Sequence, residues 1–476
     1  MTQWLEVRAK LEKIWGYSDF RSPQGEIVQT LLAGQDALIV LPTGAGKSIC
    51  FQLPALFQQG LTLVISPLVA LMENQVQELL AKGLPAAALH SELPPARQRQ
   101  VLQAVKSQQL RLLYLSPETL LTDRLWSLLI HPQLQINGLI LDEAHCLVQW
   151  GETFRPAYRR LGAVRPALLA NKPAGTKMPI AAFTATADPA AQATITEVLR
   201  LQQPTQFLIN PHRPNLHLTV QAVWTPRGRR QQLRKFIDRH PHQVGLVYVR
   251  TRQDAEELAV WLNQSGLQTI AYHAGLSPQQ RRQVEQQWLN GKLKFVICTC
   301  AFGMGINKPD VRWIAHFQSP LLLSEYVQEI GRAGRDGRPA EALMLVCEPT
   351  GWLYPDDRQR QQFFVTQLRQ LELETKQLAT KIPMAGEIAV LSRQLPKAEI
   401  ALALWHRQGL VEWTSPFHYR RLEGKTLQSS PSAYPQMLEY ANTKNCRWQY
   451  LLRAFGFTDQ GQKWRCGHCD RCSSPP

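Results

Sequence analysis

The sequence predicts an α/β fold, with two parallel-sheet domains in tandem and a smaller, mainly helical region after them. A chain of 476 residues is too long for one hydrophobic core, so several domains are expected. Short runs that are apolar on both faces alternate with stretches of helical character, which is typical of parallel strands covered by helices. Because this alternation occurs twice, we expect two such domains.

The expected strands fall into two sets on either side of a proline-containing segment. They are residues 37–41, 61–66, 111–116, 139–141 and 180–184, and then 244–249, 269–273, 295–300, 313–317 and 342–347. Residues 209–215 contain two prolines and no helical period, so a linker is expected at about 205–215. The two domains are therefore placed at residues 1–205 and 206–350.

A change of composition after residue 348 marks the end of the second domain. The sequence becomes rich in Gln and Arg, while Phe364, Leu368 and Leu371 keep helical spacing. A connecting helix is therefore expected within residues 351–383.

The next segment predicts a helix and a hairpin. Residues 396–408 favour a helix that stops at Gly409, and residues 410–422 favour two short strands around a turn. Together they suggest a winged-helix-like insertion at residues 384–430. An insertion that serves only packing fits the same pattern.

The composition favours a polyanionic partner. Lys and Arg number 53 against 37 Asp and Glu, and an excess of +16 would attract nucleic acid, although it also serves solubility. The N-terminus lacks the basic and apolar segments of a secretory signal, and no apolar run approaches the roughly 20 residues of a membrane span. A cytoplasmic protein without a membrane partner is expected, associated with the nucleoid if it is bacterial.

Residues 42–48 predict a phosphate-binding loop between a strand and a helix. Glycines let backbone N–H groups approach phosphates, and the helix N-terminus adds a positive partial charge. Lys47 would pair with the β- and γ-phosphates of ATP, and the Ser48 hydroxyl would hold Mg²⁺. Leu41 stands where the general pattern has glycine, so the match is to a looser form, and a glycine-rich turn without a ligand is the alternative. The expected nucleotide contacts here are Thr43, Gly44, Gly46, Lys47 and Ser48.

Two carboxylates follow a strand of the first domain. Asp142 and Glu143 come directly after residues 139–141, which puts both at the carboxyl edge of the sheet. Asp142 can hold Mg²⁺ together with Ser48, and Glu143 can orient and deprotonate the water that attacks the γ-phosphate.

Two arginines of the second domain are candidates for completing this site. Arg332 and Arg335 lie three residues apart, a spacing that predicts a shared helix face. Arg335 is the candidate arginine finger, and Arg332 either supports it or forms a structural salt bridge. A finger from the other domain would make hydrolysis depend on domain closure.

With these parts in order, the chain closely resembles the RecQ family of superfamily 2 DNA helicases over most of residues 10–350. Its Phe-Arg-Ser-Pro-Gln segment resembles the family's leading motif, so the resemblance assigns adenine recognition to Gln24, with Arg21 beside it. Further similar segments are 66–68, 116–118, 184–186, 273–275 and 301–309. The resemblance implies two RecA-like domains, a 3′ to 5′ DNA helicase activity and a role in recombination and repair.

An aromatic-rich segment after His145 resembles the loop with which this family senses single-stranded DNA. Trp150 and Phe154 can stack on bases at roughly 1–3 kcal/mol each, and Arg155 adds charge or stacking. Linked to His145, such a loop could report strand occupancy to the hydrolysis site. Many relatives have His-Asp where this chain has Glu152-Thr153, and packing of the aromatics in the core is the alternative.

Four cysteines gather near the C-terminus, namely Cys446, Cys466, Cys469 and Cys472. Four thiolates are enough for a closed tetrahedral Zn²⁺ site. Their C-x2-C-x2-C run also occurs in iron–sulfur proteins, and His468 could replace one thiol. The resemblance implies zinc, since the family has a four-cysteine zinc site here, and a zinc-binding subdomain is expected at residues 431–476.

The end of the chain departs from the family pattern. The family usually continues past its zinc site into a winged helix and often a further helical nucleic-acid-binding domain, whereas this chain stops at Pro476. We therefore expect a short form with a relocated winged-helix-like element at residues 384–430. Its hairpin residues could contact duplex phosphates or wedge a fork, and they are His418, Tyr419, Arg420 and Arg421.

These observations predict an ATP hydrolase coupled to DNA strand separation. ATP, Mg²⁺ and Zn²⁺ are the expected cofactors, and single-stranded DNA and duplex forks are the expected ligands. A single-strand-binding protein and other repair factors are candidate partners, and a monomer is compatible with the sequence. Two alternatives remain: an RNA helicase, and a nucleic-acid-binding or annealing protein that uses ATP only as a conformational switch.

Overall fold

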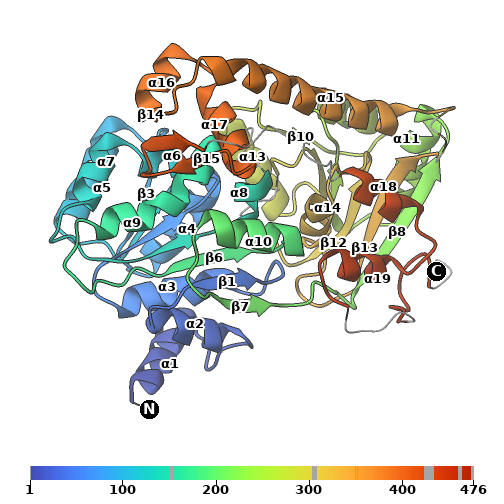
Figure 1. Ribbon diagram of the computed structural model, residues 1–476. Coiled ribbons are helices and arrows are strands. Elements are labelled where there is room, and N and C mark those ends of the chain that lie inside the picture. Colours follow the sequence, from blue (N-terminus) through green and yellow to red (C-terminus); the bar gives the residue numbers. More distant parts are fainter. Residues whose placement is uncertain are drawn as a thin grey trace. The chain divides into compact units, whose positions relative to one another are not determined.

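The computed structural model contains two α/β units (Figure 1). It describes residues 2–149, 155–302, 308–348, 350, 352–422, 434–458 and 464–472. The first unit comprises Met1–Leu41, Ala45–Ile209 and Arg369–Ser429, and the second comprises Pro42–Gly44, Asn210–Leu368 and Ser430–Pro476. Within the described residues no helix is both long and apolar enough to cross a membrane.

The sheet of the first unit has seven parallel strands in the order β3-β4-β2-β5-β6-β1-β7. Their bounds are β1 (Ala37–Val40), β2 (Leu61–Ile65), β3 (Ala86–Leu89), β4 (Leu112–Leu115), β5 (Ile136–Leu141), β6 (Ile180–Thr184) and β7 (Thr205–Leu208). Successive residues of β1 enter different core clusters: Leu38 and Val40 join one, and Ala37 and Ile39 join the other. The sheet is therefore buried on both faces, as the continuous apolar runs predict.

Two helices of this unit precede β1, and the others connect the parallel strands. The helices are α1 (Thr2–Trp15), α2 (Gln24–Leu32), α3 (Lys47–Phe57), α4 (Val69–Ala81), α5 (Pro95–Lys106), α6 (Pro117–Leu120), α7 (Asp123–Leu129), α8 (His145–Gln149), the 3₁₀ helix η1 (Pro156–Ala163), α9 (Val164–Leu169) and α10 (Pro189–Val198). Side chains cap α6 and α10: the Ser116 hydroxyl accepts the Thr119 N–H at 3.2 Å, and the Asp188 carboxylate accepts the Ala191 N–H at 2.7 Å.

The sheet of the second unit has six parallel strands in the order β10-β11-β9-β12-β13-β8. Their bounds are β8 (Leu216–Val223), β9 (Val244–Tyr248), β10 (Ala271–Tyr272), β11 (Phe295–Cys298), β12 (Val311–His316) and β13 (Ala340–Cys347). The helices are α11 (Pro226–Asp238), α12 (Arg252–Gln264), α13 (Pro278–Leu289), α14 (Leu323–Ile330), α18 (Tyr434–Asn442) and α19 (Arg447–Ala454). Helix α15 (Asp356–Gln377) belongs to this unit up to Leu368 and to the first unit from Arg369. The two α/β sheets confirm the predicted fold class.

A third, antiparallel sheet lies between α15 and α18 in the sequence. The short 3₁₀ helix η2 (Leu378–Thr380) is followed by β14 (Ala385–Glu387), α16 (Ile388–Gln394), α17 (Ala398–Arg407), β15 (Val411–Trp413) and β16 (His418–Arg421). The strands pair in the order β14-β16-β15, which gives a helix pair followed by a hairpin, as in a winged helix. We call residues 385–421 the winged element. The predicted helix and hairpin are both present, and Gly409 follows the helix at φ 66°.

Candidate nucleotide site and cysteine cluster

The predicted phosphate loop joins β1 to α3 in a conformation that requires glycine. Gly44 and Gly46 have φ angles of 83° and 74°, in the left-handed region. A Cβ on Gly46 would lie only 2.5 Å from Nε2 of Gln24, so no larger residue fits without displacing that side chain. Thr43 lies in the loop, and Lys47 and Ser48 begin α3, which aims the helix N-terminus at the loop.

Gln24 is held against this loop by two hydrogen bonds. Its Nε2 donates to the Ala45 carbonyl oxygen at 2.8 Å, and its Oε1 accepts the Arg21 N–H at 3.0 Å. The Lys47 ammonium donates to the Leu41 carbonyl oxygen at 3.3 Å. The structure thus brings Gln24 and Lys47 to the same loop, and Arg21 contacts Gln24 through its backbone N–H.

Asp142 follows the last residue of β5 and is buried. Its Oδ2 accepts from Gln75 Nε2 at 3.2 Å, and its Oδ1 accepts the Glu143 N–H at 3.1 Å. Burial and the Glu143 charge raise the pKa of Asp142 to about 6, and the Lys47 charge opposes them. Because burial disfavours the ionised form of Asp142, a cation beside it would stabilise the carboxylate. Carboxylate oxygens are ligands that Mg²⁺ prefers, so Asp142 fits a Mg²⁺ site.

Glu143 occupies a strained backbone position with φ 53°. Its Oε2 lies 3.3 Å from Nδ1 of His145, which begins α8 and is buried. The same Nδ1 lies 3.1 Å from Oγ1 of Thr184 at the end of β6. Burial opposes the imidazolium, but Cys146 and the Glu143 carboxylate outweigh it and raise the pKa of His145. The ends of β5 and β6 therefore meet at one polar cluster.

The prediction that Arg332 and Arg335 share a helix face is wrong. Helix α14 ends at Ile330, and both arginines lie in the turns after it. Three glycines interrupt the helix there, and Gly334 and Gly337 have φ angles of 60° and 81°. Arg332 is buried close to the Tyr248 hydroxyl within the second unit, whereas Arg335 is partly exposed.

The predicted strand-sensing loop is only partly described. Trp150 and Phe154 lie outside the described residues. Arg155 is the first residue after them, and its Nη1 lies 3.7 Å from Oε2 of Glu118. The structure therefore brings Arg155 close to the 116–118 motif, which lies in a separate segment of the sequence.

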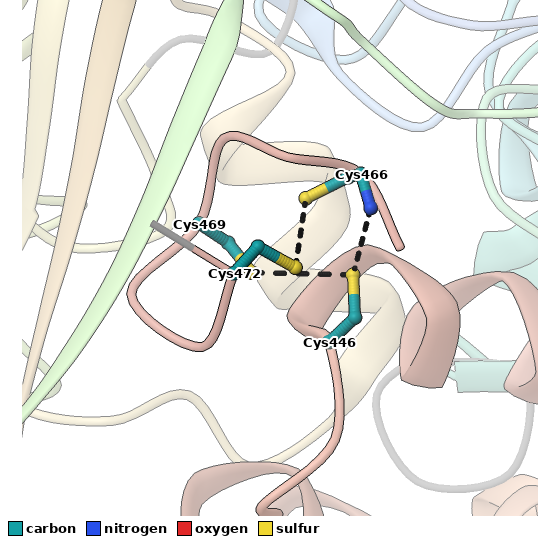
Figure 2. Close-up of side chains that lie close together, drawn as sticks. All are labelled: Cys446, Cys466, Cys469 and Cys472. Atoms are coloured by element: carbon teal, nitrogen blue, oxygen red, sulfur yellow. Dashed lines mark hydrogen bonds between the residues drawn. The ribbon is translucent and has the colours of Figure 1, made fainter. Parts of the chain in front are cut away.

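The four predicted cysteines converge on one point (Figure 2). Cys446 directly precedes α19, and the other three come from the C-terminal segment. All four sulfurs lie within 4.8 Å of one another, and the pairs 466–472 and 446–469 are each 3.9 Å apart. Tetrahedral zinc with Zn–S bonds of about 2.3 Å places its sulfurs about 3.8 Å apart, so the arrangement fits Zn²⁺.

Backbone donors and an ion pair with a buried arginine support the cysteine cluster. The N–H groups of Cys466 and Arg447 donate to the sulfurs of Cys446 at 3.3 Å and Cys469 at 3.4 Å, which favours thiolates. The Arg447 guanidinium donates two hydrogen bonds to the Asp470 carboxylate, at 2.9 and 3.0 Å. His468 turns away from the sulfurs, since its Nδ1 lies 3.2 Å from the Leu216 carbonyl oxygen.

Sequence reasoning missed two residues of these sites. Gln75 holds Asp142 but stands alone in α4, with no motif around it. Asp470 lies inside the cysteine run, and its Oδ2 also accepts the Val220 N–H at 3.2 Å, which ties the run to β8. Its position between two ligand cysteines was the available signal.

A second group with metal-ligating side chains proves to be an ion pair. Cys347, Asp356 and Asp357 lie together, but the Arg229 guanidinium occupies their centre. It lies 3.0 and 2.9 Å from the two carboxylates and 3.0 Å from the Cys347 sulfur. This cation already balances the acidic charge, so the group needs no metal.

Comparison with known proteins identifies three matching family models and several relatives. The models are DEAD/DEAH box helicase over residues 21–194, helicase conserved C-terminal domain over 228–337, and RecQ zinc-binding over 421–473. The ATP-dependent DNA helicase RecQ of Synechocystis is 53% identical over 466 residues, covering 97% of each chain. The RecQ helicase of Pasteurella multocida is 40% identical over 98% of this chain, which spans only 62% of that relative.

Solved structures share the fold at low sequence identity. Saccharomyces cerevisiae Dbp5 bound to RNA and ADP BeF3 has a TM-score of 0.58 at 16% identity, covering 76% of this chain and 91% of its own. The DEAD-box helicase Mss116 bound to single-stranded RNA and UDP-BeF has a TM-score of 0.59 at 15% identity, covering 73% of each chain. Identities this low support the shared fold alone.

Proposed function

Since this chain belongs to the RecQ family of ATP-dependent DNA helicases, we propose that it hydrolyses ATP to move 3′ to 5′ along single-stranded DNA and separate duplexes. The observation that carries the proposal is the polar cluster at the carboxyl edge of the seven-stranded sheet. There the phosphate loop, the Asp142–Glu143 pair and His145 stand at the carboxyl ends of neighbouring strands. This edge is where open α/β sheets bind their ligands.

In the proposed mechanism the phosphate loop and the residues around it bind and orient the nucleotide. The backbone of Thr43, Gly44 and Gly46 receives the phosphates, and Lys47 balances their charge. Gln24 and Arg21 face the adenine. Ser48 and Asp142 would hold Mg²⁺, which when bound neutralises charge on the phosphate oxygens.

Glu143 acts on the attacking water. Its carboxylate accepts the water proton and holds the oxygen in line with the γ-phosphorus. His145, 3.3 Å from that carboxylate, fixes its orientation and links it to Thr184. Arg335, with Arg332 in support, supplies positive charge from the second unit, so hydrolysis requires both units.

The segment after α8 is the proposed contact site for single-stranded DNA. Trp150, Phe154 and Arg155 would contact single-stranded DNA, and His145 at the start of α8 would relay that contact to Glu143. Duplex forks are the proposed substrate, recombination and repair the proposed setting, and a single-strand-binding protein a proposed partner. Cys446, Cys466, Cys469 and Cys472 would hold Zn²⁺, which closes the C-terminal fold.

The test measures ATP hydrolysis and strand separation on 3′-tailed, 5′-tailed and blunt duplexes of DNA and RNA. Hydrolysis should rise with single-stranded DNA, and unwinding should require the 3′ tail. Lys47→Ala should abolish hydrolysis, while Glu143→Gln should keep ATP binding and lose turnover. Unwinding of 5′-tailed DNA alone would refute the polarity, and stimulation by RNA but not DNA would refute the substrate.

A further inference from the structure

The winged element packs on the first α/β unit. Residues 369–429 belong to that unit, although they follow the second sheet in the sequence. They also fall largely between the ranges of the second and third family models, at 228–337 and 421–473. The packing therefore concerns a part of this chain to which the family models assign no role.

Helix α17 forms one side of the contact. Its residues Ala398, Ala401, Leu402 and Trp405 are buried in a cluster that also contains Ala163, the last residue of η1. Charge accompanies this apolar contact, since the Arg160 side chain of η1 lies 3.8 Å from Glu399. Helix α17 is therefore covered by η1.

The hairpin forms the other side of the contact. At its turn, Phe417 packs edge to face on Trp126 of α7, with ring centroids 5.1 Å apart and planes at 79°. Arg160 lies over the Trp413 ring at 5.9 Å, and Arg200 donates to the Trp413 carbonyl oxygen at 3.0 Å. The tip of the hairpin is thus anchored on the first unit.

These contacts use the surfaces with which a winged helix would grip a duplex. The second helix of such a pair normally enters the major groove, and here that helix is α17. Of the four hairpin residues proposed for phosphate contact, Tyr419 is buried, and Arg421 donates to the carbonyl oxygens of Ala379 and Ile382. Only His418 and Arg420 are exposed. The docked element is therefore poorly suited to duplex binding.

The surface that the element covers leads to the hydrolysis site. Helix η1 begins directly after Arg155, and its Tyr158 is fully buried in one core cluster with Cys146 of α8. Cys146 follows His145, whose imidazole lies 3.3 Å from the Glu143 carboxylate. Helices α8 and η1 are thus the two described segments on either side of the proposed strand-sensing loop.

We propose that the winged element is an internal brace: by clamping η1 it positions Tyr158, α8 and His145, so that strand binding can control hydrolysis at Glu143. This role rests on the proposed function. Arg160, Trp413 and Phe417 are then positioning residues. Arg160 and Trp413 act at η1, and Phe417 holds the hairpin on α7 through Trp126. None of the three belongs to the proposed nucleotide or strand-binding residues.

The experiment weakens the docking of the winged element in the full-length protein by changing either partner of the Phe417–Trp126 pair. Phe417→Ala and Trp126→Ala each remove one ring of the same pair, and Phe417→Asp places a charge in the contact. An edge-to-face pair stabilises docking by roughly 2- to 10-fold. Hydrogen exchange of α17 reports undocking, and ATP hydrolysis is measured with and without single-stranded DNA.

Loosening should raise exchange in α17 and lower the DNA-stimulated kcat by roughly 2- to 10-fold for the alanine variants and by more for the aspartate variant. Hydrolysis without DNA should stay at the wild-type rate. Faster hydrogen exchange in α17 with undiminished DNA stimulation of ATP hydrolysis would overturn the brace. Unchanged exchange in all three variants would overturn it too, because the Phe417–Trp126 pair would then not contribute to docking of the winged element.

A control separates the brace from a duplex-binding wing. His418→Ala with Arg420→Ala removes the two exposed hairpin side chains proposed for phosphate contact and leaves the Phe417–Trp126 pair intact. This double variant should bind forks and hydrolyse ATP as the wild type does, whereas weakened fork binding would support a wing that contacts DNA and contradict the brace. Absence of DNA stimulation in the wild type would instead refute the proposed function.

Discussion

Replacing Gly46 with alanine should damage the phosphate loop in two separable ways. Its φ of 74° costs a non-glycine residue about 1–2 kcal/mol. The new Cβ would also stand 2.5 Å from Gln24 Nε2, so Gln24 must move and give up its 2.8 Å hydrogen bond to Ala45, worth about 1 kcal/mol. The free energy of unfolding should therefore fall by about 2–3 kcal/mol, the sum of these two losses.

Gly16→Ala is the matched control for this variant. Gly16 has φ 75°, and a Cβ there would meet no described atom within 4 Å, so the control carries only the backbone cost. In urea unfolding Gly46→Ala should lose about 1 kcal/mol more than Gly16→Ala, and the excess should vanish when Gln24 is already alanine. ATP affinity should fall only in the Gly46 variant. Equal losses in the two glycine variants would refute the proposed contact with Gln24.

Three further outcomes are expected. Gln75→Ala should raise the Mg²⁺ concentration for half-maximal hydrolysis roughly tenfold, because its hydrogen bond helps to keep Asp142 ionised, and an unchanged Mg²⁺ titration would contradict this role. Cys469→Ser should lower the zinc content and unfold the C-terminal segment, as seen in the fluorescence of Trp448 and Trp464; full zinc occupancy in that variant would rule out the four-sulfur site. Burial raises the pKa of Glu329, but Arg250 and His316 outweigh it and hold that pKa at about 2. A depressed carboxyl pKa stabilises the fold above the unfolded value of about 4.3, and this contribution is lost as the pH falls towards 2. Glu329→Gln should therefore destabilise the protein at neutral pH and flatten its acid unfolding between these values, and an unchanged acid-unfolding curve would argue against the pair.

The central strands could be predicted from the sequence because burial on both faces leaves a continuous apolar run. The strands β1, β2, β4 and β6 are buried at every position. The missed strands lie at or next to sheet edges, where one face or one end meets solvent. For example, three of the four residues of β7 are exposed, so it carries no such run and occupies residues placed in the linker.

The candidate site was predictable where one short segment carries several of its residues. The phosphate loop, the Asp142–Glu143 pair and the cysteine run each have a local pattern, and the structure brings the members of each together. Contacts between distant segments have no such pattern. Gln75 contacts Asp142 from α4, which lies far from it in the sequence. The turn after Arg332 depends on glycines with positive φ angles, and the spacing of the two arginines carries no information about those angles.

The docking of the winged element was partly visible in the composition of α17. A helix that reads DNA exposes a polar or basic face, whereas a helix apolar nearly all round is buried on several sides. The sequence Ala-Glu-Ile-Ala-Leu-Ala-Leu-Trp-His-Arg carries one acidic residue and reserves its basic ones for the last turn. The hairpin of the winged element can cover only one face of α17, so another surface had to cover the remaining apolar side chains. Which surface supplies that partner, here η1, follows from the tertiary contact at Ala163 and from no feature of α17 itself.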